Sequence, residues 1–250
     1  MVRHPGFLFL FTLLILCLAA QAGFWLRKRR SLSEDERQDL GVEQAATLTL
    51  LALLIGFAFS MAVTRYDLRK SREAEEANAI GTEYVRVGLL PAADAAALRP
   101  QLKRYTDLRI RFYRTRSDAE LQEINNQTAQ LQAEMWAVVE NRAQMQQTPI
   151  IALAVAGMND VLNSQAYTQA AWWNRIPVAA WIMIIVIAVC SNLLLGFGAK
   201  SARAGSFLLV LPLAIAISLL LIADIDSPRR GLIHVAPQNL ISLSQSLPGQ

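Results

Sequence analysis

The sequence predicts an all-α membrane protein: four transmembrane helices, with long helices that extend into a helical bundle outside the membrane. Hydrophobic residues make up 54% of the 250 residues and charged residues only 18%, whereas about a quarter of a soluble domain is charged. The apolar excess lies in four blocks without charged side chains, each long enough for an α-helix to cross ~30 Å of hydrocarbon. This composition excludes a disordered chain, a collagen-like fibre and a disulfide-stapled secreted module.

The four predicted spans cover about residues 6–25, 46–64, 177–199 and 205–223. Uninterrupted apolar runs of this length indicate helices, because in lipid every backbone N–H and C=O needs an internal partner. The first span can also be interpreted as a cleaved signal peptide, since Ala20-Gln21-Ala22 follows its hydrophobic core. The basic run over residues 27–30 favours a retained anchor instead.

These spans divide the chain into four parts. Residues 1–64 form a first transmembrane pair with a short basic loop, and residues 65–176 form an extramembrane helical region. Residues 177–223 form a second transmembrane pair, and residues 224–250 form a C-terminal tail. We expect a multi-pass protein of the inner (plasma) membrane. Its orientation stays open, because basic residues in the short loops and the basic cluster after residue 64 favour opposite sides.

The extramembrane region carries helical patterns and no alternating β pattern. The second span is expected to continue as one helix over residues 46–90, because no proline intervenes before Pro91. A further helix is predicted from Asp94, with a disturbance at Pro100. Another follows Ser117, which opens a capping box, and Thr148 is predicted to cap the next. In that last helix the apolar run covers only residues 150–158.

Two features of this region predict association with further helices, and hence a homo-oligomer. A heptad stripe runs through Leu121, Ile124, Thr128, Leu131, Met135, Val138, Arg142 and Met145. A small-residue face on the long helix contains Ala77, Gly81, Tyr84 and Gly88. The charged residues of the same helix (Arg69, Arg72, Glu73, Glu76, Glu83 and Arg86) are expected largely on other faces.

Residues 75–91 read EEANAIGTEYVRVGLLP, an unusual stretch for a surface helix. Together with residues 56–66, 105–109, 174–177 and 224–231, it resembles the signature of the bestrophin-like family of bacterial membrane proteins. The architecture also resembles bestrophins, which are pentameric anion channels with four spans. The resemblance implies an oligomeric ion channel, anion-conducting and pentameric, in a lipid bilayer. The alternative is a non-conducting membrane sensor or scaffold whose helical region binds a partner.

Ile55, Phe59 and Val63 recur at i, i+4 and i+8 on the second predicted span. In bestrophins three apolar residues at this spacing form a hydrophobic neck, so the resemblance implies a pore constriction here. The alternative is that any transmembrane helix carries apolar residues at this spacing.

Structural roles are expected for the other residues of the family signature: Glu75, Glu76, Asn78, Tyr84, Arg86, Tyr105, Arg109, Asp224, Asp226 and Arg229. Adjacent carboxylates on a helix point about 100° apart, so Glu75 and Glu76 cannot act as a close acid pair. One of them is expected to pair with an arginine such as Arg109. Asp224 and Asp226 alone are too few ligands for calcium, and a local pair with Arg229 or Arg230 is expected.

Basic residues gather over positions 99–116 and include Arg99, Lys103, Arg104, Arg111 and Arg114. They are expected to form an anion-attracting surface, with lipid headgroups or plain solvent as alternatives. Residues 65–176 contain 14 basic and 13 acidic residues, and this near balance argues against nucleic acid as a partner. No catalytic motif, metal-ligand spacing or cofactor loop occurs in the sequence, so we expect neither an enzyme nor a cofactor.

Overall fold

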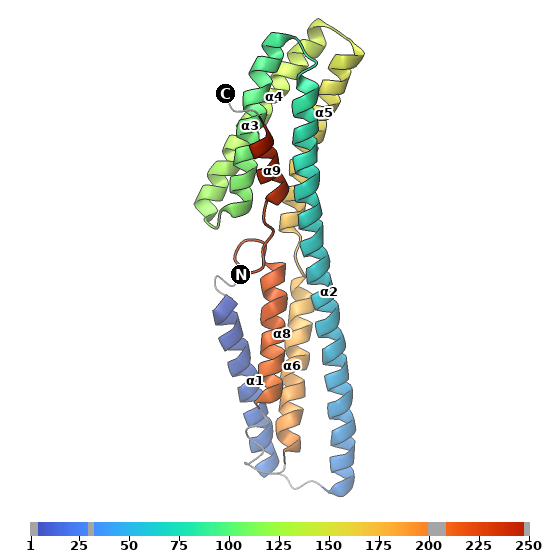
Figure 1. The fold of residues 1–250 in the computed structure, drawn as a ribbon. Helices are drawn as coiled ribbons and strands as arrows, with labels where there is room; N and C mark the ends of the chain where they lie inside the picture. Colours follow the sequence, from blue (N-terminus) through green and yellow to red (C-terminus); the bar gives the residue numbers. More distant parts are fainter. Residues whose placement is uncertain (1–4, 30–32, 200–208, 248–250) are drawn as a thin grey trace. The chain divides into compact units, whose positions relative to one another are not determined.

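The computed structural model describes residues 5–29, 33–199 and 209–247, and all regular secondary structure within them is α-helical. The helices are α1 (Pro5–Lys28), α2 (Glu34–Val87), α3 (Ala92–Arg114), α4 (Asp118–Met145), α5 (Pro149–Trp173), α6 (Val178–Gly198), α8 (Val210–Asp226) and α9 (Gln238–Ser246) (Figure 1). The predicted all-α class is therefore confirmed for this part of the chain.

The chain forms two compact units. The membrane unit consists of Met1–Thr64 and Arg175–Ile233, and the bundle unit consists of Arg65–Asn174 and His234–Gln250. Helix α2 contributes its first part to the membrane unit and its second part to the bundle unit.

Among the described residues, three stretches are long and apolar enough to cross a membrane: Gly6–Lys28, Glu34–Val87 and Pro149–Gly198. Helix α8 has 17 described residues. Residues 205–208 of the predicted fourth span lie outside the described part, as do Arg30, Lys200 and Arg203 of the predicted basic loops. The fourth span therefore stays a prediction.

Helix α1 of the membrane unit lies against α6 and α8 (Figure 1). Two glycines let the backbones of α1 and α6 approach closely. A Cβ atom on Gly196 would lie 1.8 Å from the carbonyl oxygen of Ala20, and one on Gly23 would lie 2.0 Å from the carbonyl oxygen of Leu193. Any larger residue at either position would force the two helices apart.

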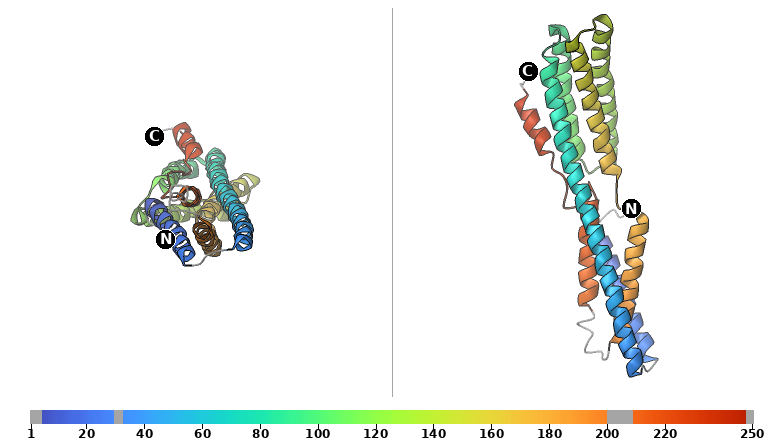
Figure 2. Two further views of the ribbon diagram at one scale, coloured as in Figure 1. Left: turned by 90° about the horizontal axis from the view of Figure 1, so that it is seen from below. Right: turned by 90° about the vertical axis from the view of Figure 1, so that its right-hand side faces the viewer.

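In the bundle unit, α3 packs against α4, α4 against α5, and the short α9 against α3 (Figure 2). Its hydrophobic core includes Ile80, Leu98, Phe112, Met135 and Met158, all fully buried. The predicted caps of α4 and α5 are confirmed. Ser117 Oγ accepts the Glu120 N–H at 3.4 Å, and Thr148 Oγ1 accepts the Ile151 N–H at 3.3 Å.

Three helices differ from their predicted extents. Helix α2 begins at Glu34 rather than near residue 46, because Ser33 and Glu36 form a reciprocal capping box. The Glu36 N–H donates to Ser33 Oγ at 3.2 Å, and the Ser33 N–H donates to Glu36 Oε2 at 2.9 Å. Helix α3 runs unbroken through Pro100. The ring of Pro100 is exposed there, so water can bond the carbonyl that lacks its helical partner. Helix α5 continues past the apolar run to Trp173.

The two surfaces predicted for subunit association are largely used within the chain. Along α4, the heptad stripe is buried from Ile124 to Met135, with Val139 rather than Val138 as its next buried residue. Leu243 of α9 covers Gly81, since a Cβ there would lie 3.1 Å from Leu243 Cδ1. An oligomer therefore needs other surfaces.

The glycine contact between α1 and α6 yields a stability prediction. We expect Gly196→Ala to lower the free energy of unfolding by about 1–3 kcal/mol, because the added methyl group overlaps the Ala20 carbonyl. Thermal unfolding of the detergent-purified protein measures this. Gly41→Ala is the matched control, because a Cβ there meets nothing within 4 Å and alanine favours a helix. Equal melting temperatures for the two variants would contradict the close approach.

Candidate functional site

Helix α2 turns charged side chains into the core of the bundle unit. Arg69, Glu73, Glu76 and Glu83 are each at most 1% exposed. They follow one another at helical spacing and share their face with Ile80. The sequence pattern predicted that these charges lie largely on other faces than Ala77 and Gly81, but it did not predict that they are buried. Buried charges need partners, and for three of the four these come from distant parts of the chain.

Glu76 is the acceptor at the centre of this face. Its carboxylate pairs with Arg109 of α3 and accepts the hydroxyls of Tyr113 at 3.3 Å and Thr168 of α5 at 3.1 Å. The pair is fully buried, and the Arg109 guanidinium stacks 4.2 Å from the Phe112 ring centroid. Burial is the largest single influence and lowers the pKa of Arg109, but the Glu76 carboxylate together with Tyr105 and Tyr113 raises it, and the net pKa is raised. The Arg109 guanidinium therefore stays charged, and the contacts of Glu76 tie α2 to α3 and α5.

Glu73 holds the beginning of α9. Its carboxylate accepts the backbone N–H of Leu240 at 2.9 Å and the side-chain amide of Asn239 at 2.6 Å. Both donors lie in the first turn of α9, where backbone N–H groups have no partner within the helix and the dipole is positive. A carboxylate is the charge that this helix end favours.

Arg69 is positively charged, and it binds the carboxyl-terminal end of a helix, whereas Glu73 binds an amino-terminal end. Its guanidinium donates to the carbonyl oxygens of Ala171 at 3.3 Å and Asn174 at 3.4 Å, at the end of α5. The last carbonyls of a helix lack partners and carry the negative end of the dipole. Two charges one turn apart on α2 thus bind the ends of two different helices.

Glu83 differs from the other three charges. Neither of its carboxylate oxygens has a hydrogen-bond partner among the described residues. The side chain lies against Gly157, where a Cβ would be 1.9 Å from Glu83 Oε2, and the neighbouring Arg86 pairs with Asp160 at 3.7 Å. Burial raises the pKa of Glu83 to about 8, with Arg86 lowering it and Asp160 raising it further. At neutral pH this carboxyl group therefore carries a proton.

The remaining signature residues of the bundle unit lie at its surface or in its core. Glu75 and Asn78 are exposed, and Glu75 pairs with an arginine one turn earlier. The Arg99 guanidinium lies 5.4 Å from the Tyr84 ring centroid. Tyr105 is fully buried, and its hydroxyl accepts an amide N–H from α4 at 3.1 Å.

The predicted neck lies on the part of α2 that belongs to the membrane unit. The buried residues of that segment are Leu40, Leu51, Ala58 and Ala62. Phe59 is 41% exposed, and Ile55 and Val63 are half-buried. The stripe therefore lies beside the packed face and stays partly accessible in a single chain. Its function as a neck stays a prediction.

The basic residues predicted to attract anions lie on the outer side of α3. Arg99, Arg104, Arg111 and Arg114 are exposed, and Lys103 is half-buried. Arg111 lies 3.3 Å from the carboxylate of Glu120, so part of this charge is balanced locally.

Asp224 holds the turn that follows α8, and Asp226 holds the segment that precedes α6. Asp226 accepts the backbone N–H of Ile176 at 3.1 Å and 3.3 Å. Asp224 accepts the N–H groups of residues 232 and 233, both at 2.8 Å. Arg229 is half-buried in the same turn. These backbone donors give no side-chain signal in the sequence, and the expected pairing with Arg229 or Arg230 stays a prediction.

No cluster of three or more potential metal ligands occurs among the described residues.

Comparisons with known proteins address the family and the fold. A profile of the bestrophin-like domain matches residues 12–240. The crystal structure of a bacterial bestrophin homologue from Klebsiella pneumoniae matches with a TM-score of 0.64 and 13% identity, over 97% of this chain and 99% of that chain. A single-residue variant of that homologue matches with a TM-score of 0.65 and 14% identity, over 97% of each chain. No curated protein sequence matches. The resemblance inferred from the sequence is confirmed.

The buried pair predicts a large effect of neutralising one partner. Glu76→Gln leaves the Arg109 guanidinium buried without its counter-charge, which typically costs about 3–5 kcal/mol. We expect a corresponding loss of stability in chemical unfolding of the purified protein. Glu75→Gln removes the adjacent, exposed carboxylate and should cost less than about 1 kcal/mol. Similar losses for both variants would contradict a central role for the pair.

Glu83 predicts a pH dependence of stability. Its folded-state pKa of about 8 lies above the usual 4.5, so the folded state holds a proton that the unfolded state releases. The stability contributed by this group is complete below pH 4.5 and is lost as the pH rises to about 8. Glu83→Gln should flatten the pH dependence of the unfolding midpoint in this window, while Glu75→Gln should leave it unchanged. An unaltered slope in Glu83→Gln would contradict the assignment.

Proposed function

The chain belongs to the bestrophin-like family, and from this premise we propose that it forms an oligomeric ion channel, anion-conducting, whose hydrophobic neck lies on α2. The observation that carries the proposal is the uncharged, partly accessible stripe of Ile55, Phe59 and Val63. Residues 46–64 around it contain no charged side chain. By resemblance to bestrophins, the assembly is a pentamer.

Exposed apolar side chains support an assembly of several copies. In the bundle unit Val85 near the end of α2 and Leu89 in the turn that follows it are exposed, and so are Ile150 and Leu153 on α5. Large apolar side chains outside the membrane favour contact with another protein surface. Since the family contains oligomeric channels, a second copy of this chain is the simplest protein surface to bury these side chains.

A ring of such stripes would select ions by hydration. An apolar constriction loses its water readily, so strongly hydrated ions meet a high barrier and weakly hydrated anions a lower one. The edge of a phenyl ring carries partial positive charge, and Phe59 side chains that point their edges inward would favour anions over cations. The exposed arginines on α3 would raise the local concentration of anions before they enter.

Halide flux through proteoliposomes that contain the purified protein tests the proposal. We expect flux in the wild type and a changed rate or halide selectivity in Phe59→Ala, because the side chain that forms the constriction is shortened. Phe57→Ala is the matched control. Phe57 is 59% exposed on the same helix, but two positions correspond to about 200° of rotation, which places it on another flank.

Two outcomes would contradict the proposal at different levels. Equal changes of halide flux in Phe57→Ala and Phe59→Ala would contradict a neck at Phe59 but not the ion channel itself. No halide flux from a folded oligomer under several ionic conditions would contradict the channel and favour a sensor or scaffold.

A further inference from the structure

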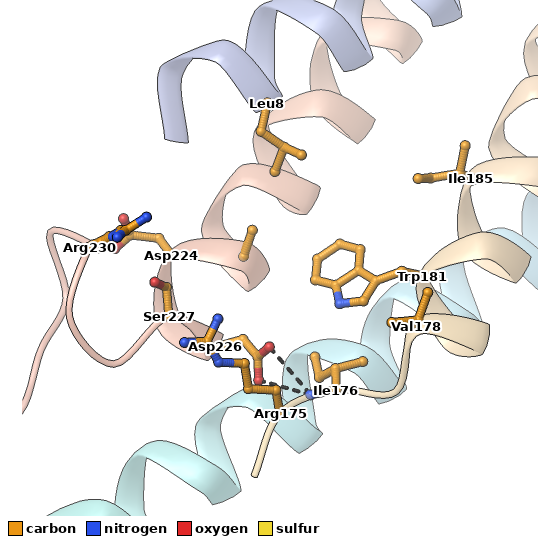
Figure 3. Close-up of a pocket in the computed structure, with 12 residues that line it drawn as sticks. Leu8, Arg175, Ile176, Val178, Trp181, Ile185, Asp224, Asp226, Ser227 and Arg230 are labelled. Atoms are coloured by element: carbon orange, nitrogen blue, oxygen red, sulfur yellow. Dashed lines mark hydrogen bonds between the residues drawn. The ribbon is translucent and has the colours of Figure 1, made fainter. Parts of the chain in front are cut away.

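The membrane unit contains a cavity of about 300 Å³. It lies where α1 and α6 begin and α8 ends, and its walls differ in chemistry. Leu8, Trp181 and Ile185 contribute to an apolar wall, while Arg175 and Arg230 belong to a polar one (Figure 3). A pocket of this size suits part of a small amphiphile.

The polar wall contains charges of both signs in equal number. Asp224 and Asp226 also line the cavity, so two carboxylates accompany the two guanidinium groups. Both carboxylates already accept backbone N–H groups, but each oxygen can accept a second hydrogen bond. Each guanidinium has five N–H donors, more than one neighbouring carboxylate can accept. The wall can therefore present donors and acceptors to a ligand while its own contacts persist.

The apolar wall continues outside the cavity. On α6 the exposed side chains of Val178, Ile182 and Val186 follow one another at i, i+4 and i+8. This row starts at Val178, which itself lines the cavity. An extended hydrocarbon chain that leaves the cavity would meet a continuous apolar surface along a helix of the membrane unit. The Trp181 indole, apolar with one N–H donor, suits the boundary between a headgroup and an acyl chain.

We propose that this cavity binds a zwitterionic glycerophospholipid of the phosphatidylethanolamine type. Its phosphate accepts hydrogen bonds from Arg175 and Arg230, and its ammonium group donates to Asp224 and Asp226. One acyl chain lies on Trp181 and continues along α6. The formal charges of the wall sum to zero, which matches a zwitterion. An anionic lipid would leave the wall and its ligand with a net negative charge. The assignment is independent of ion conduction.

Lipid-dependent thermal stabilisation of delipidated, detergent-purified protein tests the assignment. A ligand that binds only the folded state raises the unfolding midpoint as its concentration rises. We expect phosphatidylethanolamine to stabilise the wild type more than phosphatidylglycerol does. Arg230→Gln and Trp181→Ala should each weaken the apparent affinity about tenfold, which corresponds to the loss of one charged or large apolar contact. Arg229→Gln removes a neighbouring arginine that does not line the cavity and should bind like the wild type.

Controls separate binding from folding. Arg230→Lys preserves the charge and Trp181→Leu preserves the apolar character. Both variants should fold, with a lipid affinity within a few-fold of the wild type, even if Arg230→Gln and Trp181→Ala unfold. Equal stabilisation by phosphatidylglycerol would overturn the zwitterion assignment. Unchanged lipid affinity in every cavity variant would overturn the site. Cross-links from position 181 to a second copy of the chain would show that protein covers the cavity and would overturn it as well.

Discussion

The fully buried ion pair between Glu76 and Arg109 is the constraint on which the bundle unit depends. Transferring a carboxylate and a guanidinium out of water costs several kcal/mol each, and only a close pair with further hydrogen bonds recovers that cost. Tyr113 and Thr168 supply those bonds to Glu76. Since the partners of Glu76 lie on α3 and α5, its contacts form only when α2, α3 and α5 are all in place. Nη1 and Nη2 of Arg109 have no hydrogen-bond partner among the described residues. A buried pair of this kind specifies one packing arrangement more than it adds stability.

The same face of α2 also determines where two other helices end. Arg69 binds the carbonyl end of α5 and Glu73 binds the amide end of α9, each with the charge that the helix dipole favours. Helix α2 therefore organises the bundle unit through charges, while in the membrane unit it carries the apolar stripe around Phe59. One continuous helix combines the two tasks, and this explains why its sequence changes abruptly from apolar to charged after Thr64.

Local signals in the sequence predicted local structure well. The apolar blocks predicted α1, α6 and residues 46–64 of α2, and Ser117 and Thr148 predicted the beginnings of α4 and α5. The capping box at Ser33 and Glu36 begins α2 earlier than its apolar run predicts, because several of the residues between the two are polar or charged. The inward direction of Glu73 and Arg69 could not be predicted. Their partners lie more than 100 residues further along the chain, and helical periodicity alone cannot distinguish a solvated charge from a buried one. The same holds for Asp224, whose backbone donors become visible only once the turn is built.

The central claim is that several copies of α2 surround an ion path with Phe59 at its narrowest point. A cryo-electron microscopy structure of the purified protein in lipid nanodiscs tests this claim most directly. The account predicts a closed ring of identical chains with an axial lumen, lined by α2 and constricted at the level of Phe59. A monomer, or an assembly in which the Phe59 flank of α2 faces lipid and no lumen exists, would contradict it.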